Sequence, residues 1–474
     1  MTGDEDCLLP TDKFSRTFEF AGIFEANEHR TLPLSVEIVH SPVNSHVPKG
    51  IIRGTGKDYE IIKQFFRNSR APTCVLRSSS EKRDSIVCKD VLLHRIRNRL
   101  FPHDERGTVH QVIGHFSFEE LEIRRVFGSR SDGFRKRAQF IIDGPAMLWM
   151  THSGRLLADT GEIENRVWDS SISLEGMTEA IEARPHYVYA QPSRTGIIRE
   201  VAQAELFSLI INAPEGDPRG TEEFMIDASE IADTLCLLVG FLSKSPIRWF
   251  SSTCADGDVI IERHRAVKTN FDEPPKWDEV VLSSENIRKF ITTAFSAYRK
   301  APTTRLPILY YIWSQSARFA EERFTVLFFA FEKILSFLDK LQPEPELLSE
   351  AELSALWKVV RPALTAIGKS PEQAELIQDK RSELRRPSLW HRVQCQMRIL
   401  SISLDDVGGD EGLRKMIKVR NRLTHDGDEV PIDQVVFETK RLETIVERML
   451  LRLLGWSSDQ QTPTGANRAI VSLS

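Results

Sequence analysis

Alternating apolar and polar residues mark several short segments in the first half of the chain. Phe18–Phe20 and Leu34–Ile38 carry apolar side chains at every second position, which is typical of strands with one buried face. Comparable segments span residues 109–118, 138–142, 187–190 and 201–211. Many short strands separated by turns favour a sandwich or a barrel-like sheet. We therefore expect a β-rich domain over residues 1–225.

The pattern changes after this domain. Residues 227–242 predict a helix, because apolar residues recur on one helical stripe. Residues 248–250 and 259–261 predict a hairpin that turns around Asp256-Gly257-Asp258. We assign this αββ segment, residues 226–283, to the N-terminal domain as an extension.

From Ser284 onward the apolar residues recur with a period of 3.6. The first stripe consists of Ile287, Phe290, Ile291, Ala294, Phe295 and Tyr298. Further helices are predicted over 306–320, 323–341, 412–424 and 432–454, with others beginning near Ser349, Ser370 and Ser388 and a loop at 405–409. Successive helices with short breaks favour an antiparallel bundle. The sequence thus predicts an α+β chain whose helical domain spans 284–456, followed by a flexible polar tail at 457–474.

Composition narrows the class of protein. The 474 residues are 41% apolar and 28% charged, as in soluble globular proteins, and the length predicts two or three domains. The 63 Lys and Arg and 68 Asp and Glu give a net charge of −5, which points to no general nucleic-acid-binding surface. A local basic site can still serve a nuclease. The six cysteines form no CxxC pair, so we expect reduced thiols and a cytoplasmic protein.

Several common functional signatures do not occur. The acidic start, Met1–Asp6, lacks the regions of a signal peptide, and the apolar run Leu235–Leu242 is shorter than the roughly 20 residues that span a bilayer. No P-loop or Rossmann glycine pattern is present, which argues against an NTPase or a dehydrogenase. The histidines at 103, 110 and 115 complete no tight metal-ligand pattern. We expect no metal, no cofactor and no membrane partner.

One short segment carries candidate chemistry. Residues 418–427 read Lys-Val-Arg-Asn-Arg-Leu-Thr-His-Asp-Gly, so Arg420 precedes His425 by five positions and is followed by Asn421. Arginines also precede other histidines at four to six positions, among them His103 and His391, so the spacing alone decides little. His103 lies in the strand-rich half and His391 close after a proline. Only the segment at 418–427 combines a following polar residue with a predicted helix.

The helices on either side of the segment at 418–427 support its choice as the candidate catalytic segment. The chain closes with a long helix ending Met-Leu-Leu-Arg-Leu-Leu-Gly-Trp at residues 449–456, and an earlier helix contains Arg-Phe at 323–324 and Phe-Glu-Lys-Ile-Leu at 331–335. Together with the motif, residues 305–456 resemble the HEPN ribonuclease family. The resemblance implies an all-helical bundle, Arg420 and His425 as the catalytic pair, and a homodimer whose two motifs line one cleft. It also implies an endoribonuclease that leaves a 2′,3′-cyclic phosphate.

The order of domains adds a second resemblance. A β-rich domain before such a bundle is similar to the ApeA-type anti-phage defence proteins. This likeness implies a toxin-like role in abortive infection, with cellular RNA such as tRNA as the substrate. It also implies that the N-terminal domain senses a phage-derived trigger.

The two residue types suit metal-independent RNA cleavage. An imidazole with a pKa of about 6.5 can accept the 2′-hydroxyl proton, and a guanidinium can hold two phosphate oxygens. Five steps of an unbroken α-helix rotate a side chain by about 140°, so Arg420 and His425 would not share a face. Supporting candidates are Asn421 and Thr424, beside the pair, and Glu332, as an active-site carboxylate or as the ion-pair partner of Arg420.

Other interpretations remain open. A histidine at a helix end is often a partner of the helix dipole, Arg420 could be structural, and Asn421 and Thr424 could be caps. The chain would then be an inactive HEPN-like dimerisation module with a β-sandwich ligand-binding domain. A carbohydrate-binding sandwich fused to a helical scaffold is a third possibility. Its usual cluster of exposed aromatic residues is not evident, because the tryptophans are dispersed.

Overall fold

The structure is a computed structural model that describes residues 16–25, 31–40, 49–55, 75–78, 84–89, 91–103, 107–118, 120–126, 135–143, 171–189, 203–265, 281–282, 284–341, 348–379, 387–426 and 430–456. Its strands are β1 Arg16–Glu25, β2 Thr31–His40, β3 Lys49–Thr55, β4 Val75–Ser78, β5 Asp84–Lys89, β6 Leu92–His103, β7 Gly107–Ser117, β8 Glu120–Val126, β9 Arg137–Asp143, β10 Ser171–Ile172, β11 Ala180–Tyr189, β12 Gln203–Asn212, β13 Arg248–Ala255 and β14 Val259–Arg265. Its α-helices are α2 Thr221–Ser243, α3 Ser284–Lys300, α4 Arg305–Gln315, α5 Ala320–Leu341, α6 Glu350–Ala366, α7 Pro371–Asp379, α8 Leu389–Ile399, α9 Gly409–Asn421 and α10 Ile432–Leu453. Three short turns of other helix types are η4 Pro302–Thr304, η6 Asp405–Val407 and η7 Arg422–Asp426.

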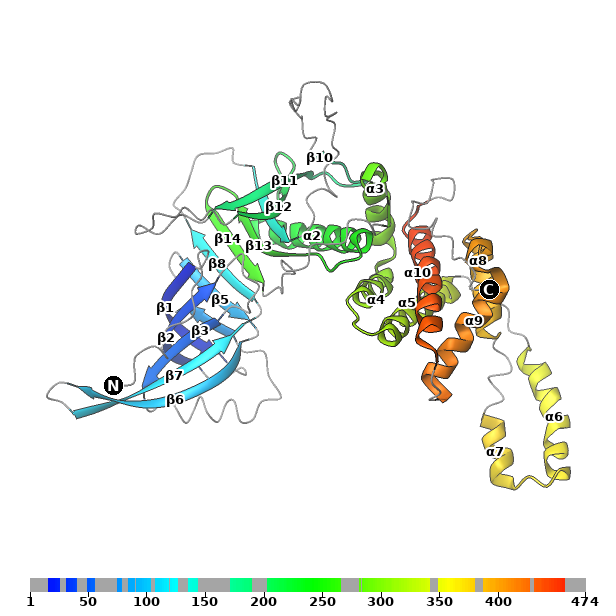
Figure 1. The fold of residues 1–474 in the computed structure, drawn as a ribbon. Helices are drawn as coiled ribbons and strands as arrows, with labels where there is room; N and C mark the ends of the chain where they lie inside the picture. Colours follow the sequence, from blue (N-terminus) through cyan, green and yellow to red (C-terminus); the bar gives the residue numbers. More distant parts are fainter. Residues whose placement is uncertain are drawn as a thin grey trace. The chain divides into compact units, whose positions relative to one another are not determined.

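The described residues cluster into two compact units. A β-rich unit contains the strands, α2 up to Val239 and the start of α3 up to Thr292. A helical unit contains the remaining helices and the segment Gly240–Pro246. The expected α+β composition, with strands in the N-terminal half and helices in the C-terminal half, is confirmed (Figure 1). The expected tail at 457–474 lies outside the described residues.

The strands of the β-rich unit form one hydrogen-bonded sheet. Its order is β10-β11-β12-β9-β13-β14-β8-β5-β4-β1-β2-β3-β7-β6, and neighbouring strands are antiparallel throughout. The segments predicted from alternation fall in β1, β2, β7, β9, β11 and β12, except for residue 118, which follows β7, and residues 190 and 201–202, which are not described. The predicted hairpin is confirmed as β13–β14, and it lies between β9 and β8 inside the sheet.

The helix α2 packs against the middle of this sheet. Phe140 of β9 and Trp249 of β13 are fully buried and meet edge to face with ring centroids 5.3 Å apart. Arg265 of β14 stacks on Trp249 at 3.5 Å and donates a 2.8 Å hydrogen bond to Asp233 of α2. The helix begins at Thr221, earlier than predicted, because its first turn carries acidic rather than apolar residues, which suit a helix N-terminus but hide the periodicity.

The helical unit has its core between α5 and α10, which lie side by side (Figure 1). The buried side chains of these helices include Phe324, Leu327, Phe331, Ile334, Leu442, Ile445, Val446 and Met449. The stripe predicted on α3 is confirmed, since Ile287, Phe290, Ile291, Ala294 and Phe295 are buried. Among the helices that the structure describes, none combines the length and the apolar character needed to cross a bilayer.

Local capping explains several helix ends. The helices predicted to begin near Ser349, Ser370 and Ser388 do so, because each hydroxyl accepts a 3.3 Å hydrogen bond from a backbone N–H three residues later. At the other end of the unit, Gly455 takes a φ of +81° after α10, and the Trp456 N–H then reaches the Leu451 carbonyl at 2.9 Å. This turn brings Trp456 into a buried position.

Several expected helix boundaries are wrong, among them those of the helix predicted over 412–424, which spans Gly409–Asn421 and is followed by η7. The helix predicted over 306–320 ends at Gln315, and α5 begins at Ala320 rather than at residue 323. The first turn of α5 carries acidic residues, which suit a helix N-terminus, so a search for recurring apolar residues does not find this turn. Residues 405–409 are not a plain loop, because they contain the η6 turn and the first residue of α9.

Candidate functional site

The motif helix α9 is fixed by a buried arginine from α10. Arg441 donates hydrogen bonds to the Val407 carbonyl at 2.7 Å and to the Gly412 carbonyl at 3.2 Å. It also forms a buried ion pair with Glu438, whose pKa is raised by burial although the guanidinium opposes that shift. Because Arg441 binds backbone carbonyls near the start of α9, it sets the position of the helix that carries the motif.

Gly412 allows this close approach. A Cβ atom at this position would lie 2.5 Å from the Val407 carbonyl oxygen and 2.9 Å from Arg441 Nε. Glycine inside a helix normally costs about 1 kcal/mol relative to alanine, so the substitution would usually stabilise the protein.

We predict the opposite sign for Gly412→Ala, a loss of ~1–3 kcal/mol in the free energy of unfolding, because the carbonyl and the guanidinium must both move. The measurement is denaturant unfolding followed by circular dichroism at a helical wavelength. Gly220→Ala is the matched control, since a Cβ there meets nothing within 4 Å. Equal or greater stability of Gly412→Ala would contradict this packing.

Arg420 lies at the C-terminal end of α9 and is held in place by neighbours. Its Nη2 donates to Glu332 Oε1 of α5 at 3.1 Å, and its Nη1 donates to Asn421 Oδ1 at 3.2 Å. Its guanidinium carbon lies 5.5 Å from the centre of the Phe328 ring. The side chain keeps 25% exposure and that of Glu332 keeps 37%. Arg420 is thus oriented by a carboxylate and a ring but still accessible to a ligand.

The backbone after Arg420 is wider than an α-helix. Residues 422–426 form the π-helical turn η7, in which hydrogen bonds join residues five apart. Such a turn brings positions five apart closer to one face than the regular helix expected from the sequence. Thr424 donates from Oγ1 to the Arg420 carbonyl at 2.8 Å, so it bonds to the backbone of the turn. The backbone of His425 lies in η7, whereas its side chain is outside what the structure describes.

Glu332 also lines an open cleft of about 530 Å³. Its other lining residues come from α4, α5 and α8 and are Tyr310, Phe329, Lys333, Leu335, Ser336, Leu389 and Arg392. Two cations, aromatic rings and the carboxylate that holds Arg420 therefore meet at one surface. Arg392 is positioned by an ion pair with Asp339 of α5.

The aromatic rings beside this cleft form a group that the sequence analysis missed. Tyr310 lies 5.6 Å from Trp313 and 6.1 Å from Phe329, measured between ring centres. Trp313 is 42% exposed and Phe329 is 46% exposed. Tyr310 and Trp313 are three residues apart and so share a helix face. This spacing was the feature of the sequence from which part of the aromatic group could have been predicted. Their proximity to Phe329 depends on how α4 packs against α5.

Two of the other histidines that an arginine precedes at a similar spacing are His391 and His103. His391 is exposed in the first turn of α8, with its Nε2 3.8 Å from Cys395 Sγ, and it does not line the cleft. The backbone of His103 ends β6, and its side chain is not described. Within the described ranges, no group of three or more His, Cys, Asp or Glu side chains is arranged to hold a metal ion.

The structure therefore brings Arg420, Asn421 and Glu332 together and joins Thr424 to them through the backbone. The ion pair expected between Arg420 and Glu332 is present. Comparisons with protein-family models, curated proteins and solved structures found no match. The functional argument thus rests on the residues and their geometry.

Proposed function

We propose that the chain is a cytoplasmic, metal-independent endoribonuclease whose helical unit is a HEPN-type bundle. In this proposal His425 is the general base and Arg420 binds the scissile phosphate. The observation that supports it most is the accessible Arg420 guanidinium, which is oriented by Glu332, a residue that also lines a cleft with aromatic and cationic side chains. Arginine suits this role because its planar group offers two donors to two phosphate oxygens.

The proposed reaction is an internal attack within the RNA. The His425 imidazole takes the proton from the 2′-hydroxyl, and the 2′-oxygen then forms a bond to phosphorus. The bond from phosphorus to the 5′-oxygen breaks, and this oxygen takes up a proton. The products are a 2′,3′-cyclic phosphate and a 5′-hydroxyl. Arg420 stabilises the extra negative charge on the phosphate oxygens, while Glu332 and Asn421 keep the guanidinium in place.

The surroundings of the pair favour single-stranded RNA as the substrate. Exposed aromatic rings stack on bases, which contributes about 1–3 kcal/mol per base, and nearby cations attract the backbone. Trp313 and Phe329 offer such rings, and Lys333 and Arg392 offer the charges. Loops of tRNA present unstacked bases of this kind, so tRNA is a suitable cellular target.

We further propose that the protein acts in anti-phage defence by abortive infection. The β-rich unit, as a sandwich or barrel-like domain, would sense a phage-derived trigger, and the helical units of two copies would pair so that both motifs face one cleft. Joining a sensing domain to a ribonuclease in this way would keep the ribonuclease inactive on cellular RNA until the trigger binds.

Purified full-length protein is expected to cleave mixed cellular RNA equally well in EDTA and in Mg²⁺, because the proposed base and cation are both side chains. The measurement is the appearance of fragments by gel electrophoresis over time. A preparation carrying His425→Ala is the control for contaminating nuclease. Complete loss of cleavage in EDTA, with recovery on adding Mg²⁺ or Mn²⁺, would overturn the metal-independent mechanism.

The competing candidate is an inactive dimerisation module joined to a ligand-binding β-sandwich. It is favoured by the ion pair between Arg420 and Glu332, because a purely structural arginine would need such a partner. In that case light scattering would still detect a dimer, while no RNA would be cut under any condition. A monomer that cuts RNA would instead refute the paired arrangement and keep the ribonuclease.

A further inference from the structure

The exposed face of the motif helix α9 carries basic residues that the proposed reaction does not use. Residues 412–425 contain no Asp or Glu but five cations, in a chain whose net charge is −5; these are Arg414, Lys415, Lys418, Arg420 and Arg422. Arg414, Lys418 and Asn421 are exposed, and their spacing of four and three positions places them on one face of the helix. We call Arg414 and Lys418 the α9 cation row.

Neighbouring carboxylates do not neutralise this row. The two carboxylates at the start of α9 are engaged elsewhere, because Glu411 pairs with Lys415 at 2.9 Å and Asp410 accepts from Gln394 of α8 at 2.6 Å. Within the part of the chain that the structure describes, no carboxylate lies within ion-pair distance of either residue of the row. The row therefore offers two positive charges to a ligand.

One end of the row is positioned by an aromatic ring. The guanidinium carbon of Arg414 lies 4.1 Å from the centre of the Trp390 ring in α8, which is a cation–π contact. The same start of α8 contributes Leu389 and Arg392 to the cleft of about 530 Å³. The first residues of α8 thus contact the row and also line this cleft.

The other end of the row adjoins the candidate catalytic segment. Asn421 follows Lys418 by three positions on the same face, and its Oδ1 accepts from Arg420 Nη1 at 3.2 Å. Arg420 leaves the helix about 160° away from Lys418, since two residues turn the helix by about 200°. The hydrogen bond to Asn421 therefore brings the Arg420 guanidinium round to the end of the row.

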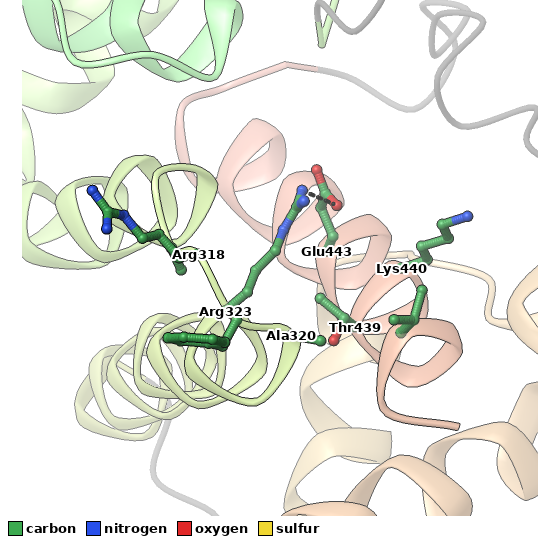
Figure 2. Close-up of a pocket in the computed structure, with 9 residues that line it drawn as sticks. Arg318, Ala320, Arg323, Thr439, Lys440 and Glu443 are labelled. Atoms are coloured by element: carbon green, nitrogen blue, oxygen red, sulfur yellow. Dashed lines mark hydrogen bonds and ion pairs between the residues drawn. The ribbon is translucent and has the colours of Figure 1, made fainter. Parts of the chain in front are cut away.

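Packing holds α9, and with it the row, in place. Arg441 of α10 binds backbone carbonyls near the start of α9, and Glu443 ties α10 to α5 because it accepts from Arg323 at 3.0 Å (Figure 2). The cations on either side of this bond do not serve one ligand, since Arg318 and Lys440 point away from each other (Figure 2). The α9 cation row, in contrast, lies on one face of one anchored helix, so a ligand does not have to order its backbone.

We propose that the α9 cation row binds the phosphate backbone of single-stranded RNA on one side of the scissile bond. This assignment rests on the proposed ribonuclease function. Four helical residues rise by about 6 Å, so the two cations are spaced along α9 by a distance comparable with that between neighbouring phosphates of an RNA strand. They bind two phosphates of the strand whose scissile phosphate is held by Arg420.

Two other roles for these cations give different results. Cations near the end of a helix interact favourably with its dipole, and in that role they affect stability but not RNA binding. An acidic peptide would be attracted by the same charges and would compete equally well with RNA. Binding and unfolding measurements on matched variants separate the three roles.

The test is the affinity of the full-length protein for a fluorescent single-stranded RNA whose 2′-hydroxyls are all methylated, measured by anisotropy between about 50 and 200 mM salt. Methylation removes the attacking group, so binding is measured without cleavage. A polyglutamate peptide with the same number of charges is the second probe. The test variant is Arg414→Ala with Lys418→Ala. The matched control is Lys415→Ala with Lys358→Ala, which also removes two cations, one already paired with Glu411 and one exposed on α6.

We expect the wild-type protein and the control to bind the RNA, and the test variant to bind it at least roughly tenfold more weakly. The slope of log affinity against log salt concentration should become shallower by about 1.4, because each of two lost phosphate contacts contributes about 0.7. The midpoint of thermal unfolding should match that of the control. Equal affinity in the test variant, no RNA binding by the wild-type protein, or equally tight binding of polyglutamate would overturn the proposal.

Failure of the proposed function would be recognised separately, by cleavage of the unmethylated strand. A wild-type protein that cuts this strand, together with a test variant that binds the methylated strand normally, would refute the row and keep the ribonuclease. RNA binding that depends on the row in a protein that cuts no RNA would keep the row as an RNA-binding surface and refute only the ribonuclease.

Discussion

Replacement of His425 by alanine is expected to lower the rate of RNA cleavage by roughly 10²–10⁴-fold, because a positioned general base contributes about that factor. The reason lies in the sequence and the backbone together. His425 follows the oriented Arg420 by five positions, and η7 turns the backbone so that positions five apart approach one face. Single-turnover rates on an end-labelled RNA, with protein in excess, measure the chemical step directly.

Two matched substitutions control for the loss of a histidine. His391→Ala and His103→Ala are expected to keep most of the activity, since only His425 follows an Arg-Asn pair at the end of a helix. Circular dichroism must show that each variant is folded. If folded His425→Ala cleaves RNA at the wild-type rate, the assignment of the base is wrong. The dimerisation module becomes the better interpretation if the wild-type protein and all three variants show the same rate as buffer alone.

Arg420→Ala is expected to reduce cleavage by roughly 10²–10³-fold, the effect of removing one group that stabilises transition-state charge. Arg420→Lys should restore little of this loss, because an ammonium cannot hold two phosphate oxygens in one plane. The bundle should tolerate either change. Glu332 is 37% exposed, so water can solvate its carboxylate once the guanidinium is gone, and an exposed ion pair contributes little to stability.

A structural role for Arg420 makes different predictions. In that case Arg420→Ala would lower the midpoint of thermal unfolding in step with the loss of activity, and Arg420→Lys would recover both. Glu332→Gln provides a further check, since it keeps the shape of the side chain but removes the charge that orients Arg420. We expect this variant to stay folded and to lose less activity than Arg420→Ala. Full activity in folded Arg420→Ala would remove the arginine from the mechanism.

The parts of the fold that depend on neighbouring residues could be predicted from the sequence. The serines at 349, 370 and 388 mark helix starts because a cap is a contact over three residues. Alternation located β1, β2, β7, β9, β11 and β12, since side chains on one strand point to opposite faces by geometry alone, whereas β3 to β6, β8 and β10 were not predicted. The pairing order of the sheet could not be predicted in the same way, and so the place of β13–β14 between β9 and β8 emerged only from the structure.

The candidate site also has parts that could be predicted from neighbouring residues and parts that depend on helix packing. Arg420, Asn421 and Thr424 lie within five positions of the sequence, and Glu332 was expected either as an active-site carboxylate or as the ion-pair partner of Arg420 that it proves to be. The aromatic group could not be predicted, because Phe329 joins Tyr310 only when two helices pack. The buried ion-pair network of the helical unit was missed for a similar reason. It joins Arg323 to Glu443, 120 positions away, and Lys244 to the same carboxylate, 199 positions away.

The chemistry of the cleaved ends tests the central claim most directly. Purified full-length protein is incubated in EDTA with one RNA sequence and with the same sequence made of DNA, and the fragments are weighed by mass spectrometry. Attack by the 2′-hydroxyl predicts RNA fragments that end in a 2′,3′-cyclic phosphate and begin with a 5′-hydroxyl, and it predicts intact DNA. Cleavage of the DNA, or RNA fragments that carry 5′-phosphates and 3′-hydroxyls, would contradict the proposed roles of Arg420 and His425.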